Sequence, residues 1–367
     1  MSTNPEVEVA APITQRPRIG RYVTRTAIVA VLYFGILVYP IVRLIGLLLP
    51  YWTPNTIELL AIIVGPILGR VVYERHPSAA TRTLAAIALT WLGVCFQLFA
   101  VMLVFEVVNA VMPLPGQAAG AVIATLITAL SIVGFINAQI LHVRRVRIPG
   151  PSIVAGRTLV QISDVHIGSR SPELLKRIVE RVNALEPDYV LITGDLIDFA
   201  GISRAELAPL GTFNAPALFA IGNHERYVDL AAIDERMRSL GVSVLRDEAM
   251  THGPFQFIGI DDVDVAARIP APLSRIKLSK DHYAVLMYHR PDGFDASAEH
   301  GIPLMLAGHT HAGQIIPFNF IVKRIYPRMR GLHELNGSRL YVSPGTGTWG
   351  PVLRIGSRSE ITLLEFV

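Results

Sequence analysis

Four runs of apolar residues in the first 145 positions constrain the fold of this chain more than any other feature of its sequence. They cover residues 26–49, 57–73, 84–105 and 118–141. An α-helix needs about 20 apolar residues to cross the hydrocarbon layer of a bilayer. In that layer the backbone polar groups must be satisfied inside the segment, which a helix achieves. The sequence therefore predicts an all-α transmembrane bundle of about four helices over residues 26–145, after an N-terminal segment, residues 1–25.

Composition supports a membrane protein. Hydrophobic residues make up 51% of the 367 positions and charged residues only 17%, below the roughly 25% typical of soluble domains. The single cysteine, Cys95, lies inside the third apolar run, which excludes a disulfide framework and a cysteine-based metal site. The net charge of +4 comes largely from arginines at the ends of apolar runs, so we expect no nucleic-acid partner.

The placement of the arginines predicts an orientation in the membrane. They precede the first run, separate the second from the third, and follow the fourth: Arg16, Arg18, Arg21 and Arg25; Arg70, Arg75 and Arg82; Arg144, Arg145 and Arg147. The loops at 50–56 and 112–118 carry no lysine or arginine. The positive-inside rule then places the N-terminus, the middle loop and everything after residue 141 in the cytoplasm. We expect an integral cytoplasmic (inner) membrane protein with a cytoplasmic catalytic domain.

Few polar groups interrupt the apolar runs. Arg43 either reaches toward the interface or faces the bundle interior, where charge is often functional. The other polar residues are Gln97, Asn109 and Asn137. This pattern favours a membrane anchor over a ligand or lipid path. The first run is also too long for the apolar core of a signal peptide.

The second half of the chain has the pattern of an α/β domain. We expect a linker at 146–157 and a folded domain at 158–367. Predicted strands cover residues 158–162, 189–192, 218–221, 242–245, 255–260, 284–288, 303–306, 339–342 and 361–366. One helix begins at Ser171-Pro172-Glu173, and a second covers residues 229–240. This order predicts a sandwich of two mixed sheets flanked by helices, with ligands on loops at one edge.

Five short polar segments each follow a predicted strand. They are Asp164-Val165-His166, Gly194-Asp195-Leu196-Ile197-Asp198, Gly222-Asn223-His224-Glu225, His289, and Gly308-His309-Thr310-His311. Ligands gather at strand ends in open α/β sheets. Hard oxygen donors combined with imidazoles suit Mn, Fe, Zn or Mg.

These segments, in this order, resemble those of the calcineurin-like metallophosphoesterases. The resemblance covers residues from about 158 to the C-terminus. It is strongest to the bacterial membrane-associated branch, in which the last motif continues into Gly-Gln, as in Gly313-Gln314. Ala312 departs from the glycine that is frequent there. The resemblance implies two divalent metal ions, the first held by Asp164, His166, Asp195 and His311, and the second by Asp195, Asn223, His289 and His309.

The resemblance also implies roles in catalysis. A hydroxide between the two metals would attack phosphorus, and the bridging Asp195 would reduce the repulsion between the cations. His224 would contact the phosphate and protonate the leaving group, with Glu225 as the residue that orients it. Asp198 would support a ligand imidazole or the turn.

Local geometry adds two expectations. Asp164 and His166 alternate in sequence, so in an extended strand both would point to one metal. His309 and His311 have the same spacing but would bind different metals, which requires a turn in the backbone between them. Gly308 favours such a turn.

Three further features remain outside these motifs. Residues 315–330 interleave apolar and basic side chains, which fits either an interfacial loop that binds lipid headgroups or substrate phosphates, or a basic loop packed on the domain. Asp261, Asp262 and Asp264 form either a third metal site or, as we expect, a solvated turn. His252, His282, His300 and His333 are expected at the surface.

The sequence thus predicts a membrane-anchored metal-dependent phosphoesterase. Its substrate would be a phosphodiester or pyrophosphate, in a lipid or a lipid precursor. The alternatives are a phosphomonoesterase or phosphoprotein phosphatase, and a catalytically inactive membrane scaffold. The oligomeric state stays open.

Overall fold

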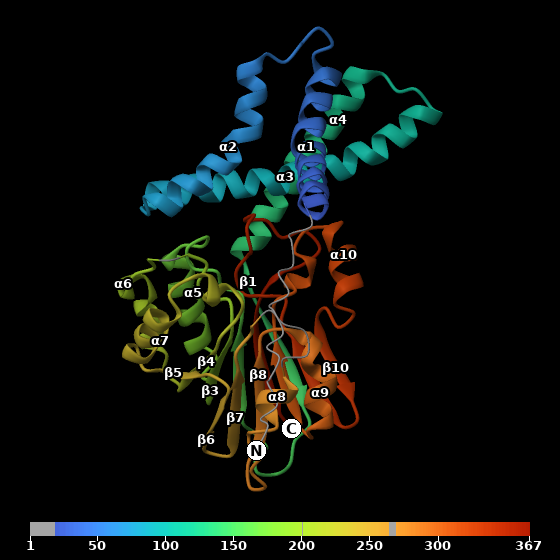
Figure 1. The fold of residues 1–367 in the computed structure, drawn as a ribbon. Coiled ribbons are helices and arrows are strands. Elements are labelled where there is room, and N and C mark those ends of the chain that lie inside the picture. Colours follow the sequence, from blue (N-terminus) through green and yellow to red (C-terminus); the bar gives the residue numbers. More distant parts are fainter. Residues whose placement is uncertain (1–18, 200, 264–268) are drawn as a thin grey trace, which may run out of the picture.

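Four long helices form the N-terminal half of the protein. The computed structural model describes the backbone of residues 19–199, 201–263 and 269–367, and side chains from residue 32 onward. The helices are α1 (Ile19–Leu48), α2 (Thr56–Arg75), α3 (Ala79–Val111) and α4 (Gly116–Gln139). They stand at one end of the molecule (Figure 1). This confirms the predicted helical region and its approximate number of helices.

Three of these helices, α2, α3 and α4, are long and apolar enough to cross a membrane. Among the residues with described side chains, α1 adds a shorter apolar stretch, Leu32–Leu48. Capping boxes begin two of the helices: Asn55 exchanges hydrogen bonds with Glu58, and Ser78 with Thr81. These caps satisfy backbone N–H groups that a helix start leaves without partners.

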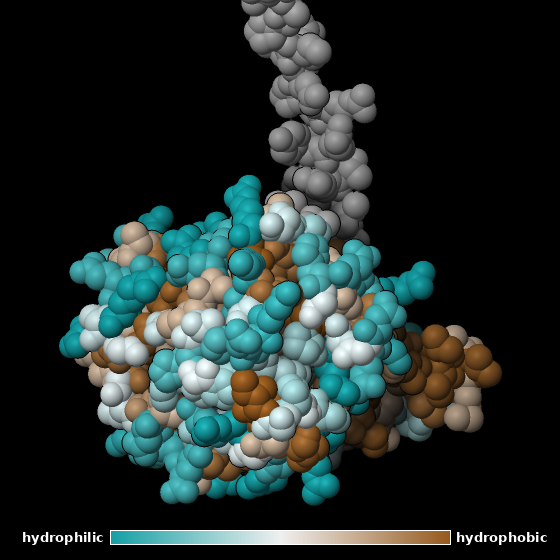
Figure 2. All heavy atoms as spheres, turned by 90° about the horizontal axis from the view of Figure 1, so that it is seen from below, coloured by the Kyte–Doolittle hydropathy of each residue, from teal (hydrophilic) through white to brown (hydrophobic). Residues whose placement is uncertain are grey.

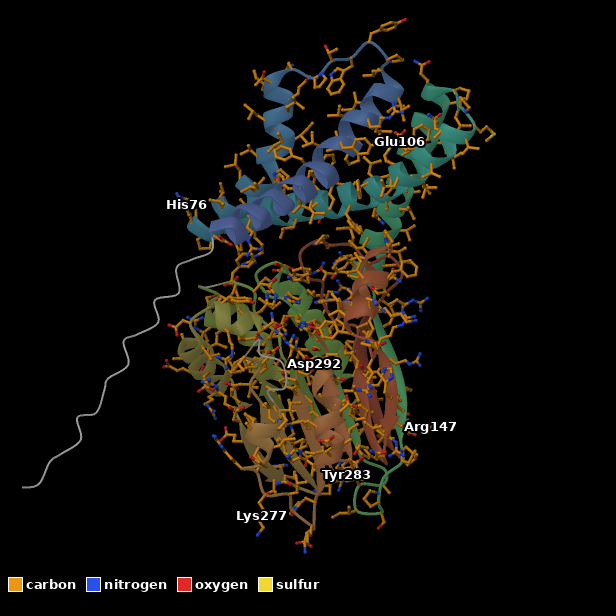
Figure 3. The ribbon with its side chains drawn as sticks, turned by 45° about the vertical axis from the view of Figure 1, so that its right-hand side comes forward. His76, Glu106, Arg147, Lys277, Tyr283 and Asp292 are labelled. Atoms are coloured by element: carbon orange, nitrogen blue, oxygen red, sulfur yellow. The ribbon has the colours of Figure 1, made fainter. Side chains whose placement is uncertain are left out.

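Apolar side chains hold the bundle together. Leu37 of α1, Met102 of α3 and Ile127 of α4 are buried in one cluster. Arg43 is paired on the same helices: its Nε lies 2.6 Å from Oε1 of Glu106 on α3, which Figure 3 labels. Since the two charges compensate each other, Arg43 faces a neighbouring helix and is explained by packing.

The C-terminal half is a sandwich of two six-stranded mixed sheets (Figure 1). The first sheet has the order β1-β12-β2-β3-β4-β5, with β1 (Leu141–Ile148), β12 (Ser359–Phe366), β2 (Thr158–Ile162), β3 (Tyr189–Thr193), β4 (Ala217–Ala220) and β5 (Val242–Leu245). The second has the order β10-β11-β9-β8-β7-β6, with β10 (Gly331–Leu335), β11 (Ser338–Val342), β9 (Leu304–Ala307), β8 (Tyr283–Tyr288), β7 (Phe255–Ile260) and β6 (Glu248–His252). The predicted fold class is confirmed.

Helices and short helical turns flank the sandwich and its membrane-side end. They are α5 (Pro172–Asn183), α6 (Arg204–Leu207), η1 (Ala208–Thr212), η2 (His224–Tyr227), α7 (Leu230–Ser239), α8 (Pro270–Leu273), η3 (Pro291–Gly293), α9 (Phe294–Glu299), η4 (His311–Gly313) and α10 (Phe318–Ile325). The longest of those on the sandwich, α5, buries Leu175, Ile178 and Val182 against the first sheet, as its spacing predicts. Between the sheets, Leu191 packs in one cluster with Phe257.

The sheet begins earlier than the sequence pattern indicates. We expected the first strand at residue 158, after a linker at 146–157. Instead β1 follows α4 almost directly and pairs in parallel with β12 over its full length. Its exposed arginines, including Arg147, hide the alternation that marks a strand. The apolar helix α4 therefore continues into the edge of the first sheet.

The direction of the strands places their loops. β1 starts at α4, and β12 runs parallel to β1, so both start near the membrane helices. β2 runs antiparallel to β12, and β3 and β4 run parallel to β2. The strands β2, β3 and β4 therefore end near the membrane helices. Figure 3 shows Lys277 and Tyr283 at the opposite end of the molecule. Inside the sandwich, Gln161 donates to the carbonyl of Ala307 at 2.9 Å, which ties the two sheets together directly below these loops.

Candidate metal centre and its link to the membrane helices

The five predicted segments meet at the membrane-side end of the sandwich. Asp164 follows β2, Asp195 follows β3 and Asn223 follows β4, while His289 and His309 follow β8 and β9 of the other sheet. Three groups of ligand atoms have the spacing that a metal ion needs: Asp164, His166 and His311; Asp195, His289 and His309; and His166, Asp198 and His224.

The backbone of the ligand loops is unusual. Asp164, His166, Asp195, His309 and His311 all have positive φ, between 48° and 68°. Non-glycine residues seldom adopt this conformation, and its occurrences cluster at functional sites. Our expectation of an extended strand through Asp164 and His166 is therefore wrong, because both lie in a left-handed loop beyond β2. The expected turn at His309 and His311 is present.

One group of donors is built around two facing imidazoles. The Nε2 atoms of His166 and His311 lie 3.0 Å apart, and the Asp164 carboxylate is 3.3 Å from His311 Nε2. Burial, together with the positive charge of His166, lowers the pKa of His311 well below its usual value. A neutral His311 offers its lone pair, and a carboxylate beside two imidazoles is a donor set suited to a divalent cation.

The second group contains a histidine whose tautomer is fixed. His289 Nδ1 lies 2.8 Å from the carbonyl of Thr193 and donates to it, so Nε2 faces Asp195 Oδ2 at 2.9 Å. Such a backbone contact is the usual support of a metal-binding imidazole. In the same cavity, Asn223 Oδ1 is buried without a hydrogen-bond partner. A buried amide oxygen without a partner is unfavourable unless a cation binds it, so the residues fit a divalent metal.

Glycines in the motifs leave room for the carboxylates. A Cβ on Gly308 would lie 2.2 Å from Asp164 Oδ2, and one on Gly222 would lie 2.2 Å from Asp195 Oδ1. Any larger residue would displace the expected ligands. This explains why glycine precedes His309 and Asn223 in the two motifs.

Asp198 connects two histidines. Its Oδ1 lies 2.5 Å from His166 Nδ1 and 2.7 Å from His224 Nδ1, and Ser169 donates to its other oxygen. Burial opposes the charge, but His166 and His224 hold the pKa of Asp198 below its usual range. An ionised Asp198 thus orients the ring of His224, whose Nε2 faces the site 3.9 Å from Asp195 Oδ2.

Glu225 has a different position from the one we expected. Its buried carboxylate accepts four backbone N–H groups, those of Asp195, Leu196, Ile197 and Gly222, at 2.7–3.1 Å. It therefore holds two ligand loops in place, and Asp198 is the residue that contacts the ring of His224. Burial and the neighbouring Asp195 raise the pKa of Glu225 to about 6.

Comparison with known proteins agrees with this geometry. A family model described as calcineurin-like phosphoesterase matches residues 157–313. An uncharacterised metallophosphoesterase of Aquifex aeolicus is 32% identical over 226 residues, which are 56% of this chain and 83% of that protein.

The chain belongs to the calcineurin-like phosphoesterase family.

Two other relatives of this metallophosphoesterase have informative names. A Danio rerio "transmembrane protein with metallophosphoesterase domain" is 36% identical over 270 residues, 66% of this chain and 61% of that protein. The Escherichia coli "phosphodiesterase YaeI" is 30% identical over 202 residues, 50% of this chain and 71% of that protein. The chain spans 59% to 63% of the length of two further bacterial relatives.

The sequence analysis missed a loop that joins the metallophosphoesterase domain to the membrane helices. In residues 343–358, here called the docking loop, Arg354 is fully buried. Its guanidinium donates to the carbonyls of Pro344, Gly345 and Gly347 at 2.7–3.1 Å. The only sequence signal is an arginine enclosed by Val352, Leu353 and Ile355, which is too weak to assign a role.

The docking loop contacts both the membrane helices and a ligand loop. Arg354 N donates to the carbonyl of Gly134 on α4 at 2.9 Å, and Val352 N to Thr90 Oγ1 on α3 at 3.1 Å. From the other side, Gln314 Nε2 donates to the carbonyl of Pro351 at 2.9 Å, and Trp349 N donates to Gln314 Oε1. Gln314 of the Gly-Gln motif therefore links the loop of His311 to the membrane domain.

Two other regions differ from expectation. Residues 315–330 contain the amphipathic helix α10. Asp261 and Asp262 are buried; the first pairs with Arg226 and Arg246 and the second with Arg290, so the predicted solvated turn is wrong for these two. Asp264 lies outside the described residues. The pairing also gives Arg226 a structural role.

Proposed function

We propose that this protein is a metal-dependent hydrolase of a phosphodiester or pyrophosphate bond in a membrane lipid or a lipid-linked precursor. The observation that carries the proposal is the convergence of three carboxylates, an amide and five imidazoles at one end of the sandwich, directly beneath the membrane helices. The name of the Escherichia coli relative is consistent with cleavage of a diester.

Two of the three donor groups correspond to the two expected ions, and the third contains Asp198 and His224, which would bind no metal. Asp164, His166 and His311 would hold one ion, His289, His309 and Asn223 the other, and Asp195 would bridge them. When bound, the ions would acidify the attacking water and neutralise charge on the phosphoryl oxygens. Their identity among Mn, Fe, Zn and Mg is left open, because all four accept this mixture of oxygen and nitrogen donors.

The protein side chains supply the remaining chemistry. His224 holds a proton on its ring and delivers it to the leaving oxygen as the P–O bond breaks. Asp198 fixes the orientation of that ring, since it contacts Nδ1 at 2.7 Å and leaves Nε2 toward the site. Glu225 keeps the two loops that carry Asp195 and Asn223 at a constant separation.

Two alternatives are less well supported. A phosphoprotein phosphatase or a phosphomonoesterase for soluble substrates would need a polar approach to the site, whereas the adjoining cavity is bounded by Leu92, Phe96 and Phe318. An inactive scaffold would be expected to have lost a ligand, but the donor set is complete.

Metal dependence tests the hydrolase proposal. The full-length protein is treated with a chelator in detergent and dialysed. It is then expected to lose roughly 95% or more of its activity on bis-p-nitrophenyl phosphate, because an essential metal activates the attacking water. Activity should return in proportion to the Mn²⁺ taken up, measured by elemental analysis on the same sample. Retained activity without metal, or full metal loading without activity for any of the four metals, would contradict the proposal.

We also propose that the catalytic domain faces the cytoplasm, on the basis of the arginine distribution. A reporter enzyme that is active only in the periplasm, fused after Val367, should remain silent in cells. The same reporter fused into the loop between α3 and α4 should be active. The reverse pattern would place the site on the other side of the membrane.

A further inference from the structure

A largely apolar cavity joins the metal centre to the membrane helices. It has a volume of about 490 Å³, within the roughly 300–1,000 Å³ usual for small-ligand sites. One end is formed by the catalytic and metal-ligand side chains described above. Two walls are helical: Leu92, Gly93 and Phe96 of α3, and Phe318, Val322 and Ile325 of α10. Ile36 of α1 and Trp349 and Pro351 of the docking loop complete the lining.

The two walls belong to different parts of the protein. α3 is one of the helices able to cross a membrane, and it passes over the sandwich close to α10 (Figure 1). The rings of Phe96 and Phe318 meet edge to face, with centroids 6.1 Å apart. The two helices therefore touch at these rings, and the cavity beside the contact has apolar side chains from both of them.

The outer face of α10 is apolar as well. Phe320 and Ile321 are 67% and 52% exposed, and Lys323 and Arg324 are exposed on the same helix. An amphipathic helix with large exposed apolar residues and basic neighbours is typical of a membrane interface. By contrast, Figure 2 shows a mainly hydrophilic surface on the end of the domain that faces away from the membrane helices.

We propose that this cavity binds one hydrocarbon chain of the lipid substrate, which enters from the bilayer between α3 and α10 while its phosphate lies at the metal centre. The proposal rests on the proposed function and names the part of the substrate that is recognised. The cavity volume of about 490 Å³ is that of a site for one small ligand, which suits a single hydrocarbon chain.

The lining excludes the alternative occupants. A nucleotide or a phosphopeptide would bring polar groups against Leu92 and Phe96, where their hydrogen bonds to water could not be replaced. A chain that reaches the metal centre through this cavity never leaves an apolar environment, because α3 faces lipid on one side and the cavity on the other.

Chain-length dependence tests the proposal. The substrates are p-nitrophenyl alkyl phosphates from methyl to hexadecyl, assayed with metal-loaded full-length protein in detergent. Each added methylene should raise kcat/KM by up to about fourfold, the limit set by full burial of the group, until the cavity is filled. We expect a rise of at least 100-fold over the series, followed by a plateau.

A pair of variants separates the cavity from partition into detergent. Leu92→Trp fills the cavity and should reduce the ratio of long-chain to short-chain kcat/KM at least tenfold. Leu103→Trp makes the same change on a lipid-exposed part of α3, where Leu103 is 50% exposed, and should leave the ratio and the basal activity unchanged. An equal ratio in both variants, or a wild-type ratio near one, would overturn the chain site while leaving the hydrolase proposal intact.

A second measurement does not depend on turnover. An alkyl phosphonate with a diazirine near the end of its chain cannot be hydrolysed, and after illumination it should label peptides that contain Leu92–Phe96 and Phe318–Ile325. Leu92→Trp should suppress this labelling. Labelling confined to lipid-facing residues around Leu103 would overturn the proposal even if the enzyme proved inactive on every phosphodiester.

Discussion

Asp195→Asn is expected to reduce the bound divalent metal from two ions per chain to one or none, and to lower kcat/KM on bis-p-nitrophenyl phosphate by on the order of 10³-fold. Asp195 Oδ2 lies 2.9 Å from His289 Nε2, and Asp195 Oδ1 accepts a hydrogen bond from the backbone N–H of His224 at 2.9 Å. The amide keeps the shape of the side chain but removes the negative charge, and two neighbouring cations cannot be held close together without it.

Elemental analysis and steady-state kinetics on the same preparation measure both effects. Asp234→Asn is a matched control, because Asp234 pairs with Arg238 on α7 and belongs to none of the donor groups of the metal centre. It should bind two ions and retain wild-type activity. Two ions and undiminished turnover in Asp195→Asn would show that the metals are not bridged by this carboxylate.

His224→Gln is expected to lower kcat by on the order of 10²–10⁴-fold on substrates with an alkoxide leaving group, the usual contribution of a positioned general acid. The loss should be much smaller for p-nitrophenyl esters, since nitrophenolate leaves without a proton. His224 Nδ1 is held by Asp198, so the ring cannot turn away from the site.

The comparison of leaving groups separates proton donation from a structural effect. A fold defect would reduce both classes of substrate equally and would lower the metal content, which should remain at two ions. His333→Gln is the control and should behave as wild type. His333 is half-buried, and its described side-chain hydrogen bond joins its ring to the carbonyl of Arg330, outside the metal centre. Equal losses on both substrate classes would exclude His224 as the proton donor.

The sequence was sufficient to predict most strands, because buried strands such as β3, β4 and β8 are continuous apolar runs that end in polar motifs. It was insufficient for β1, β6 and β10. These lie at sheet edges, where exposed and charged side chains replace the apolar pattern. β1 pairs with β12, more than 200 positions further along the chain, so local composition carries no information about its neighbour. β6 and β10 form hairpins with the strands that follow them, but their own residues lack the apolar pattern of a strand.

The same division applies to the site. The motifs identified the side chains that gather at the metal centre, because metal chemistry requires particular donor atoms. They did not show that Glu225 would accept four N–H groups from two loops, or that Asp198 would contact two histidines. Such contacts depend on left-handed loop geometry. Asp and His adopt that conformation more often than most other residues, but only in a minority of cases, so Asp164 and His166 alone do not predict it. Arg354 and the docking loop were missed for the same reason.

The continuity between α4 and β1 has a practical consequence for anyone who wishes to study the hydrolase as a water-soluble fragment. A cut before Leu141 would uncover Leu353 and Ile355, which now pack against Gly134 of α4. A cut after Ile148 would remove the edge strand β1 and expose one edge of β12 along its whole length, although β12 would keep its pairing with β2. Such an exposed edge is a template for aggregation. We therefore expect that no truncation between Gln139 and Thr158 yields a stable soluble domain, because the membrane helices and the sandwich share packing and strand pairing.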